Sequence, residues 1–148
     1  MAQKLTQIYL HIIFSTKNRF DLIPANLEPE LFAYPGGITR NRGSRLIGAG
    51  GTANHIHLLI SISKNEKLPD LVGTLKRESS EWLKTKRRFE ISGQDGYGAF
   101  SVGPTQIGKI KEYIADQKIH HSSKGFEDEF RYFLEKYNME YEKKYVCD

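Results

Sequence analysis

The amino-acid sequence predicts an α+β protein in which helices pack on one face of a central antiparallel sheet. Several short segments alternate apolar and polar residues, which is typical of strands with one buried side. Other, longer segments repeat apolar residues at helical spacing. The 148 residues show no internal repeat and no linker-like stretch, so we expect a single domain over residues 1–148.

The first half of the chain predicts three strands. Residues 7–15 alternate, with an aliphatic or aromatic side chain at each even position. Residues 28–41 are compatible with a helix, but the Pro35-Gly36-Gly37 tripeptide opposes one on propensity grounds and leaves this segment open. Residues 45–50 predict a short strand, and residues 54–62 predict the clearest strand of the chain.

The second half predicts one further strand and three helices. Residues 68–88 carry an apolar stripe at helical spacing with basic residues around it. Residues 97–102 predict the fourth strand. A helix is expected to begin near Pro104, a favourable first position for proline, and to run to about His121. The last helix follows Gly125 and repeats aromatic residues at helical spacing.

The composition and the absence of several motifs exclude some classes of protein. No apolar run approaches the roughly 20 residues that span a bilayer, and the N-terminal residues do not resemble a secretion signal. The only cysteine, Cys147, cannot form an intrachain disulfide, so we expect a cytoplasmic protein. The sequence also lacks a GxxxxGK phosphate loop, a GxGxxG turn, an HExxH zinc motif and a nucleophile elbow.

Positive charge is concentrated in two places. Residues 76–88 contain six basic and two acidic residues, and a second cluster holds Arg40, Arg42 and Arg45. Such clusters commonly bind the phosphates of nucleic acids. A solvated helix face explains the charge equally well, so charge alone leaves both interpretations open.

The His55-Ile56-His57 triplet is the first candidate for chemistry. Residues two apart in a strand point the same way, so both imidazoles should project from one face at a separation suited to a shared metal ion. The other face of this strand is aliphatic, and we therefore expect the two rings on the open side of the sheet. An ordinary polar strand face is the alternative interpretation.

Tyr113 and Gln117 form the second candidate. Four residues apart on a predicted helix, they should meet on one surface, where they could supply a nucleophile and a further metal ligand. Taken alone, packing beside Ile110 and Ile114 is the commoner role for a tyrosine at this position. His120 and His121 are explained by the favourable field at the end of a helix.

The sequence resembles, almost from end to end, the small HUH single-tyrosine (Y1-type) transposases of bacterial and archaeal insertion sequences, the IS200/IS605-like group. The resemblance depends on motifs in a fixed order. These are Tyr9-Leu10-His11-Ile12-Ile13-Phe14-Ser15-Thr16-Lys17, Ala33-Tyr34, Gly36-Gly37, the segment Asn54–Ile60 around the histidine triplet, the segment Gln94–Val102 and the segment Tyr113–His121.

The resemblance implies a ferredoxin-like (RRM-like) HUH fold and a four-residue site. Tyr113 would be the nucleophile, and His55, His57 and Gln117 would bind a divalent metal ion, Mg²⁺ or Mn²⁺. Trp82, Tyr97 or Phe100 could stack on unpaired bases. The residues expected to contact the DNA backbone are Lys17, Arg40, Arg42, Arg45, Lys76, Arg77, Arg87 and Arg88.

The implied activity is that of a nucleoid-associated DNA transposase. It would cleave and rejoin single-stranded DNA at hairpin-flanked element ends through a 5′-phosphotyrosine intermediate, as a homodimer whose active sites are completed in trans. The alternative is a domesticated protein that binds repeat hairpins without transposition. A metal-binding structural domain is a third hypothesis. The sequence departs from the family at Pro35, which predicts a kinked or shortened helix, and at Asn54, where an acidic residue is common.

Overall fold

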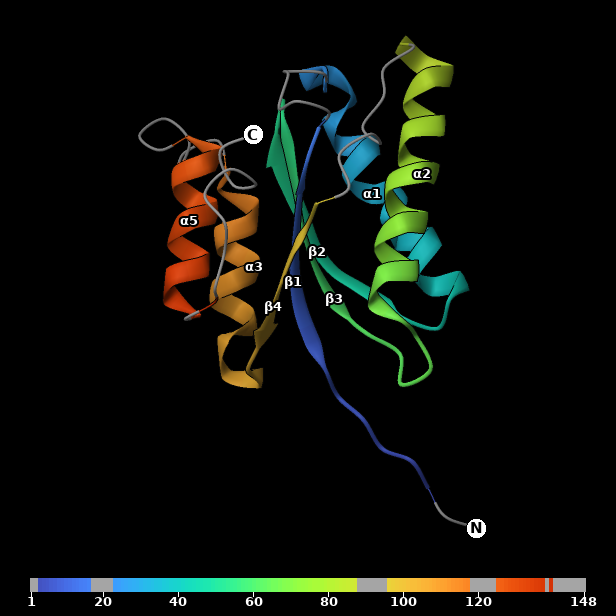
Figure 1. Ribbon diagram of the computed structural model, residues 1–148. Coiled ribbons are helices and arrows are strands. Elements are labelled where there is room, and N and C mark those ends of the chain that lie inside the picture. The colour runs from blue at the N-terminus through green and yellow to red at the C-terminus, as the bar shows by residue number, and fades with distance from the viewer. Residues whose placement is uncertain (1–2, 17–22, 88–95, 118–124, 138, 140–148) are drawn as a thin grey trace.

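A four-stranded antiparallel sheet with the strand order β2-β3-β1-β4 forms the centre of the molecule in the computed structural model (Figure 1). The structure describes residues 3–16, 23–87, 96–117, 125–137 and 139. The strands are β1 (Tyr9–Ser15), β2 (Arg45–Thr52), β3 (His55–Ser61) and β4 (Gly98–Val102). The helices are η2 (Ala25–Leu27), α1 (Glu28–Asn41), α2 (Leu68–Arg87), η3 (Pro104–Gln106), α3 (Ile107–Ala115) and α5 (Phe126–Lys136).

The predicted α+β class with a central antiparallel sheet is confirmed. All three strand pairs are antiparallel, and β1 and β3 are the two inner strands. β2 runs through both Gly50 and Gly51, which pair with His57 and Ile56, so this strand is longer than expected. The sequence therefore located all four strands, with differences at their ends.

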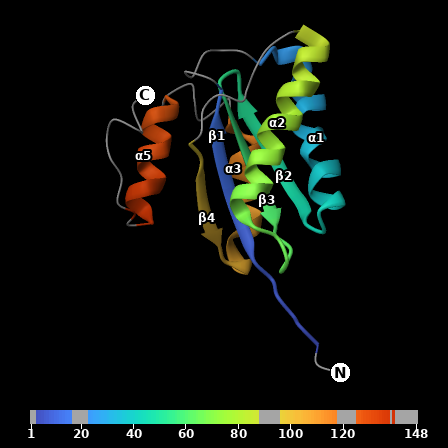
Figure 2. The same cartoon turned by 45° about the vertical axis from the view of Figure 1, so that its right-hand side comes forward.

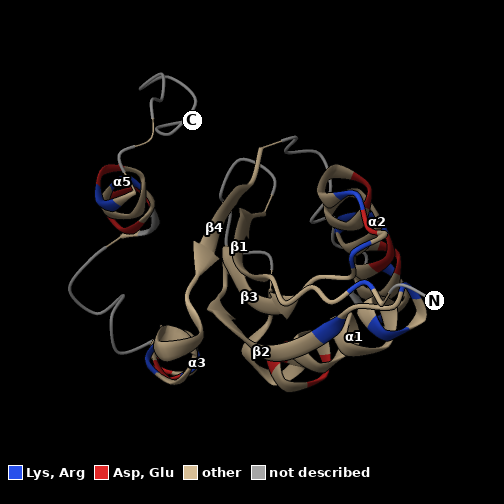
Figure 3. Ribbon diagram, turned by 90° about the horizontal axis from the view of Figure 1, so that it is seen from below, with Lys and Arg blue, Asp and Glu red and all other residues tan. Residues whose placement is uncertain are grey.

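The helices lie on both faces of the sheet rather than on one. Views along and around the sheet show α1 and α2 on one side and α3 and α5 on the other (Figures 2 and 3). The expectation of one helical layer is corrected because the inner strands are apolar on both sides: Ile12 and Leu58 face α1 and α2, whereas Ile13 and Leu59 belong to the clusters formed with α5 and α3. A sheet that is apolar on both faces needs a cover on each.

Helix α1 is continuous through Pro35, although the local sequence opposes a helix there. Proline has no backbone N–H for the helical bond to the fourth preceding residue. Leu31, Pro35 and Ile38 are nevertheless buried, and the Thr39 hydroxyl donates to the Pro35 carbonyl oxygen over 2.9 Å. Burial of this face against the sheet and α2 outweighs the weak propensity, so neither a break nor a shortened helix is seen.

Helix α3 ends at Ala115, earlier than the expected end near His121. The backbone N–H of Asp116 closes the helix on the carbonyl oxygens of Glu112 and Tyr113. His120 and His121 lie outside the described residues. In the described part of the chain, no helix combines the length and the apolar character required to cross a bilayer.

Candidate active site

Three histidines from the two inner strands face the layer that contains α3 and α5. His11 on β1 and His55 and His57 on β3 are at most 1% exposed. The register pairs Ile13 with His57 and Ser15 with His55, so the side chains of His11, His55 and His57 lie on one surface of the sheet. Their shared face was predicted correctly, but the expectation that this face is open is wrong, because α3 and α5 cover it.

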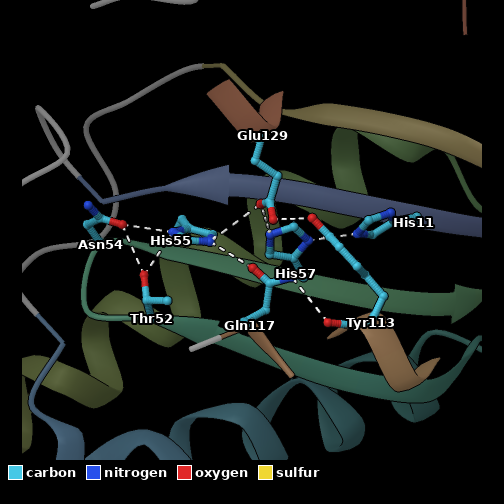
Figure 4. Close-up of polar contacts among 8 residues, drawn as sticks. All are labelled: His11, Thr52, Asn54, His55, His57, Tyr113, Gln117 and Glu129. Carbon is cyan, nitrogen blue, oxygen red and sulfur yellow. Dashed lines mark hydrogen bonds and ion pairs between the residues drawn. The ribbon is translucent and has the colours of Figure 1, made fainter. Parts of the chain in front are cut away.

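His55 is oriented by the turn that precedes it. Its Nδ1 atom lies 2.8 Å from Asn54 Oδ1 and 2.9 Å from Thr52 Oγ1, while its Nε2 atom lies 3.1 Å from Gln117 Oε1 (Figure 4). With Asn54 Oδ1 as acceptor, the ring proton sits on Nδ1. The lone pair of Nε2 then faces the carbonyl oxygen of Gln117, an arrangement of two electron-pair donors that suits a cation. Asn54 therefore makes the orienting contact that an acidic residue would make.

His57 is held between His11 and Glu129. Its Nδ1 atom lies 2.7 Å from His11 Nε2, and its Nε2 atom lies 2.7 Å from Glu129 Oε1. The pKa of His11 is lowered from 6.5 to about 3, first by burial and then by the neighbouring His57, while Glu129 opposes both effects. His11 is thus neutral and fixes the ring orientation of His57, which directs the Nε2 atom of His57 to the same place as that of His55.

Tyr113 lies directly beside this histidine pair. Its ring packs edge-on against His57, with 6.1 Å between ring centroids, and edge-on against Phe133. Its hydroxyl donates a hydrogen bond to Glu129 Oε2. Burial raises the pKa of Tyr113 well above its usual value, and the hydrogen bond and the negative charge of Glu129 raise it further. The tyrosine is therefore a protonated hydroxyl in this arrangement.

Gln117 and Glu129 bring oxygen atoms to the two imidazoles. Both side chains are buried, and Gln117 Nε2 donates to the Tyr113 carbonyl oxygen over 3.3 Å, which leaves Oε1 directed at His55. One ligand atom each from His55, His57 and Glu129 lies within 4.8 Å of the others. The structure thus gathers the four predicted residues His55, His57, Tyr113 and Gln117 at one place, and it adds Glu129.

Glu129 was not among the residues selected from the sequence. It belongs to a segment rich in acidic residues, where a carboxylate is ordinarily solvated. A signal was nevertheless present, because Glu129 lies within the aromatic stripe of the last helix, one residue before Phe130 and one turn before Phe133. A charge on the apolar face of a helix indicates a buried partner.

The predicted DNA-contacting residues differ in how exposed they are. Arg40, Arg45 and Arg77 are exposed, and Arg45 lines a surface hollow together with Lys4 and Lys64. Lys17 and Arg88 lie outside the described residues, as does the side chain of Arg87 at the end of α2. Lys and Arg also occur on α3 and α5, so positive charge is not confined to α2 (Figure 3).

Two of the predicted contact residues bind other groups of the same chain. The guanidinium of Arg42 donates from Nε and Nη2 to the two carboxylate oxygens of Glu66, over 3.0 and 2.7 Å. Lys76 is 7% exposed, and its ammonium donates to the Gly96 carbonyl oxygen over 2.8 Å. As placed here, neither side chain presents a fully free positive charge to a DNA backbone.

The candidate base-stacking residues also differ in their burial and in the rings they contact. Phe100 is buried and stacks on Phe133 and Tyr137, so it is a core residue. Trp82 is partly buried and stacks on Tyr34, with 5.7 Å between ring centroids. Tyr97 is partly buried and packs against the core between the sheet and α2.

Comparison with solved structures shows where else this fold occurs. A presumed transposase from Deinococcus radiodurans R1 superposes with a TM-score of 0.61 at 19% identity, covering 77% of this chain and 93% of that chain. A REP-associated tyrosine transposase bound to a REP hairpin superposes with a TM-score of 0.56 at 10% identity, covering 82% of this chain and 74% of that chain. The fold is therefore one that transposases use.

The sequence comparison then identifies the family. A family model described as "Transposase IS200 like" matches residues 4–117, about three quarters of the chain. The chain belongs to the IS200-like transposase family. No curated protein shows significant similarity to it. The family match ends at Gln117, so α5 and Glu129 lie beyond the matched residues.

Proposed function

We propose that the protein is a DNA transposase that cleaves and rejoins single-stranded DNA at hairpin-flanked ends through a 5′-phosphotyrosine intermediate. One observation carries this proposal: the Tyr113 hydroxyl lies at the place where buried nitrogen and oxygen atoms from strand β3 and two helical segments converge. A nucleophile beside a set of metal-ligating atoms is what cleavage of a phosphodiester requires.

The residues at this place fit a divalent metal ion. His55, His57 and Gln117 would supply two imidazole nitrogens and one amide oxygen, a mixed set suited to Mn²⁺ and acceptable to Mg²⁺. His11, Asn54 and Thr52 hold the rings so that both Nε2 atoms face the same point. When bound, the ion would polarise the scissile phosphate and offset its negative charge.

The covalent step would be carried by Tyr113. Its oxygen would attack the phosphorus atom and lose its proton, a tyrosine O–P bond would form, and the P–O3′ bond would break. The 3′ oxygen would leave as a hydroxyl after taking up a proton, and the 5′ end would stay attached to the protein. Because the phosphotyrosine keeps the energy of the broken bond, the strand could be rejoined without ATP, in keeping with the absence of a phosphate loop.

Single-stranded DNA with hairpins is the proposed substrate. The structural neighbour that binds a REP hairpin shares the fold, and Arg40, Arg45 and Arg77 are exposed and available for backbone contacts. A homodimer with active sites completed in trans remains a prediction. Within one chain, Tyr113 already contacts His57, so this contact does not require a second subunit.

A covalent adduct tests the proposed function. The protein would be incubated with a labelled single-stranded element end and Mn²⁺ or Mg²⁺, and denaturing electrophoresis should show a protein–DNA band that is lost in Tyr113→Phe. Hairpin binding that survives substitution of both His57 and Tyr113, without any adduct in the unaltered protein, would instead indicate a domesticated hairpin-binding protein. The burial of the site in this conformation is the observation that favours this second candidate.

A further inference from the structure

We propose that Glu129 is a protein ligand of the divalent ion and that it positions the Tyr113 hydroxyl beside that ion. This inference rests on the proposed function, because it concerns the same site. It assigns to α5, which lies outside the residues matched by the family model, a direct part in the metal centre.

The distances around Glu129 are those of neighbouring ligands on one ion. Glu129 Oε1 lies 2.7 Å from His57 Nε2 and 3.7 Å from His55 Nε2, and His55 Nε2 lies 3.1 Å from Gln117 Oε1. Metal bonds of about 2.1 Å at right angles place adjacent donor atoms about 3 Å apart. Small adjustments of the side chains would let all four atoms bind the same ion.

The burial of the Glu129 carboxylate between imidazoles also fits a metal ligand. Glu129 is 3% exposed, and its oxygens contact the His57 imidazole and the Tyr113 hydroxyl. An ionised carboxylate is costly to bury unless it is paired with a positive charge or binds a metal. A divalent ion between His55, His57 and Glu129 would supply that charge at the place where the three side chains meet.

The sequence of α5 directs this one carboxylate inward. Glu127 and Asp128, its two acidic neighbours, are 40% and 65% exposed and lie near Arg131 on the same helix. Glu129 instead lies one turn before Phe133, which packs edge-on against Tyr113 and His11 at centroid distances of 5.7 and 5.1 Å. The aromatic contact thus fixes the rotation of α5 that brings Glu129 to the histidines.

The two oxygens of Glu129 have different partners, which couples the metal to the nucleophile. Oε1 faces the histidines, and Oε2 accepts the hydrogen bond from Tyr113. One carboxylate group would therefore fix the separation between the ion and the tyrosine oxygen. It would also reduce the effective charge of the ion relative to a site made only of His55, His57 and Gln117.

Metal binding to the intact protein tests this assignment without DNA. Isothermal titration calorimetry with Mn²⁺ should show affinity at least roughly tenfold weaker for Glu129→Gln than for the unaltered protein. Asp128→Asn, which removes an exposed carboxylate from the same helix, should bind Mn²⁺ normally. Hydrogen exchange of the α5 amides should slow on addition of Mn²⁺ in the unaltered protein and in Asp128→Asn, but not in Glu129→Gln.

Each result distinguishes the inference from the proposed function. Unchanged Mn²⁺ affinity in a folded Glu129→Gln variant would overturn the inference and leave the proposed function intact. Weakened binding together with a missing adduct in the unaltered protein would support Glu129 as a ligand and count against transposition. If Glu129→Gln proves unfolded by circular dichroism, Glu129→Asp takes its place. This shorter carboxylate should bind Mn²⁺ more weakly than the unaltered protein, and unchanged affinity would again overturn the inference.

Discussion

The hydroxyl group of Tyr113 on α3 donates a hydrogen bond to the carboxylate of Glu129 on α5. The same carboxylate contacts His57 on β3, so two helices and an inner strand of the sheet meet at one acidic side chain (Figure 4). Glu129 helps to raise the pKa of Tyr113 at this junction, and the proposed metal ion would bind beside it.

The first prediction concerns the pH dependence of stability above neutrality. The pKa of Tyr113 in the folded protein lies above its unfolded value of about 10, first because of burial and then because of Glu129. As the pH rises above about 10, the unfolded chain loses a proton that the folded protein keeps, and the free energy of unfolding falls. Tyr113→Phe should lessen this fall, measured by urea denaturation between pH 8.5 and about 11. Equal slopes in the two proteins would contradict the prediction.

The second prediction concerns the acidic side. The pKa of His11 is lowered to about 3 in the folded protein, whereas an unfolded histidine takes up a proton near 6.5. Stability is therefore expected to fall as the pH drops below about 6.5, by up to about 1.4 kcal/mol per pH unit from this residue. His11→Gln should lose stability at pH 7 but show a shallower decline between pH 6.5 and 4.5. The metal-free protein is the sample to use. If stability declined as steeply in His11→Gln as in the unaltered protein, the lowered pKa of His11 would not be the cause of the decline.

Periodicity in the sequence was sufficient to place the histidine pair. The alternation in residues 54–62 correctly put His55 and His57 on one face, because side-chain direction in a strand is a local property. The helical spacing of Tyr113 and Gln117 also brought both to the site, although α3 ends between them. Local patterns therefore predicted which side chains share a surface.

The layer that covers that surface could not be predicted in the same way. Whether α3 and α5 pack over the histidines depends on contacts between residues that are distant in the chain, such as Ile13 with Phe133. Glu129 was missed for the same reason, since its partner His57 is 72 positions away. The continuity of α1 through Pro35 likewise depends on tertiary burial, which outweighs local propensity.

The third prediction concerns the close approach of α3 to β2. A Cβ atom added at Gly50 would lie 2.2 Å from the Ile114 carbonyl oxygen, so the backbone of α3 would have to move. Gly50→Ala should destabilise the protein by about 1–3 kcal/mol, the range for an overpacked core. Because Ile114 follows Tyr113, this variant should also form less covalent adduct. Chemical denaturation and the adduct assay measure the two effects.

Gly73 on α2 provides the matched control for Gly50. A Cβ atom there would meet nothing within 4 Å, and the residue is exposed on the helix. Gly73→Ala should therefore stabilise the protein by roughly 0.5–1 kcal/mol through the better helical propensity of alanine. If both variants changed stability in the same direction, close packing between Gly50 and Ile114 would not be the cause.

The fourth prediction concerns the salt dependence of hairpin binding. Arg45 is exposed beside Lys4 and Lys64, whereas Arg131 on α5 pairs with Glu127 over 2.8 Å. If Arg45 neutralises one DNA phosphate, Arg45→Gln should weaken hairpin binding and reduce the slope of log affinity against log salt by roughly 0.7–0.9. Arg131→Gln should leave both quantities unchanged. Fluorescence anisotropy over a range of salt concentrations measures the slope, and an unaltered slope in Arg45→Gln would remove this residue from the DNA-binding surface.

The fifth prediction concerns the turn that orients His55. Asn54 Oδ1 is a hydrogen-bond partner of Nδ1 in the His55 ring. Asn54→Ala removes this hydrogen bond and leaves the proposed metal ligands unchanged. Loss of an orienting partner commonly weakens metal affinity about 10–100-fold, so Mn²⁺ binding should fall within that range. Asn54→Asp keeps an oxygen at the same position and should bind Mn²⁺ at least as well as the unaltered protein. Calorimetry on both variants separates the two outcomes. Normal binding in Asn54→Ala would show that Thr52, whose hydroxyl lies 2.9 Å from the same nitrogen, is sufficient to orient the ring.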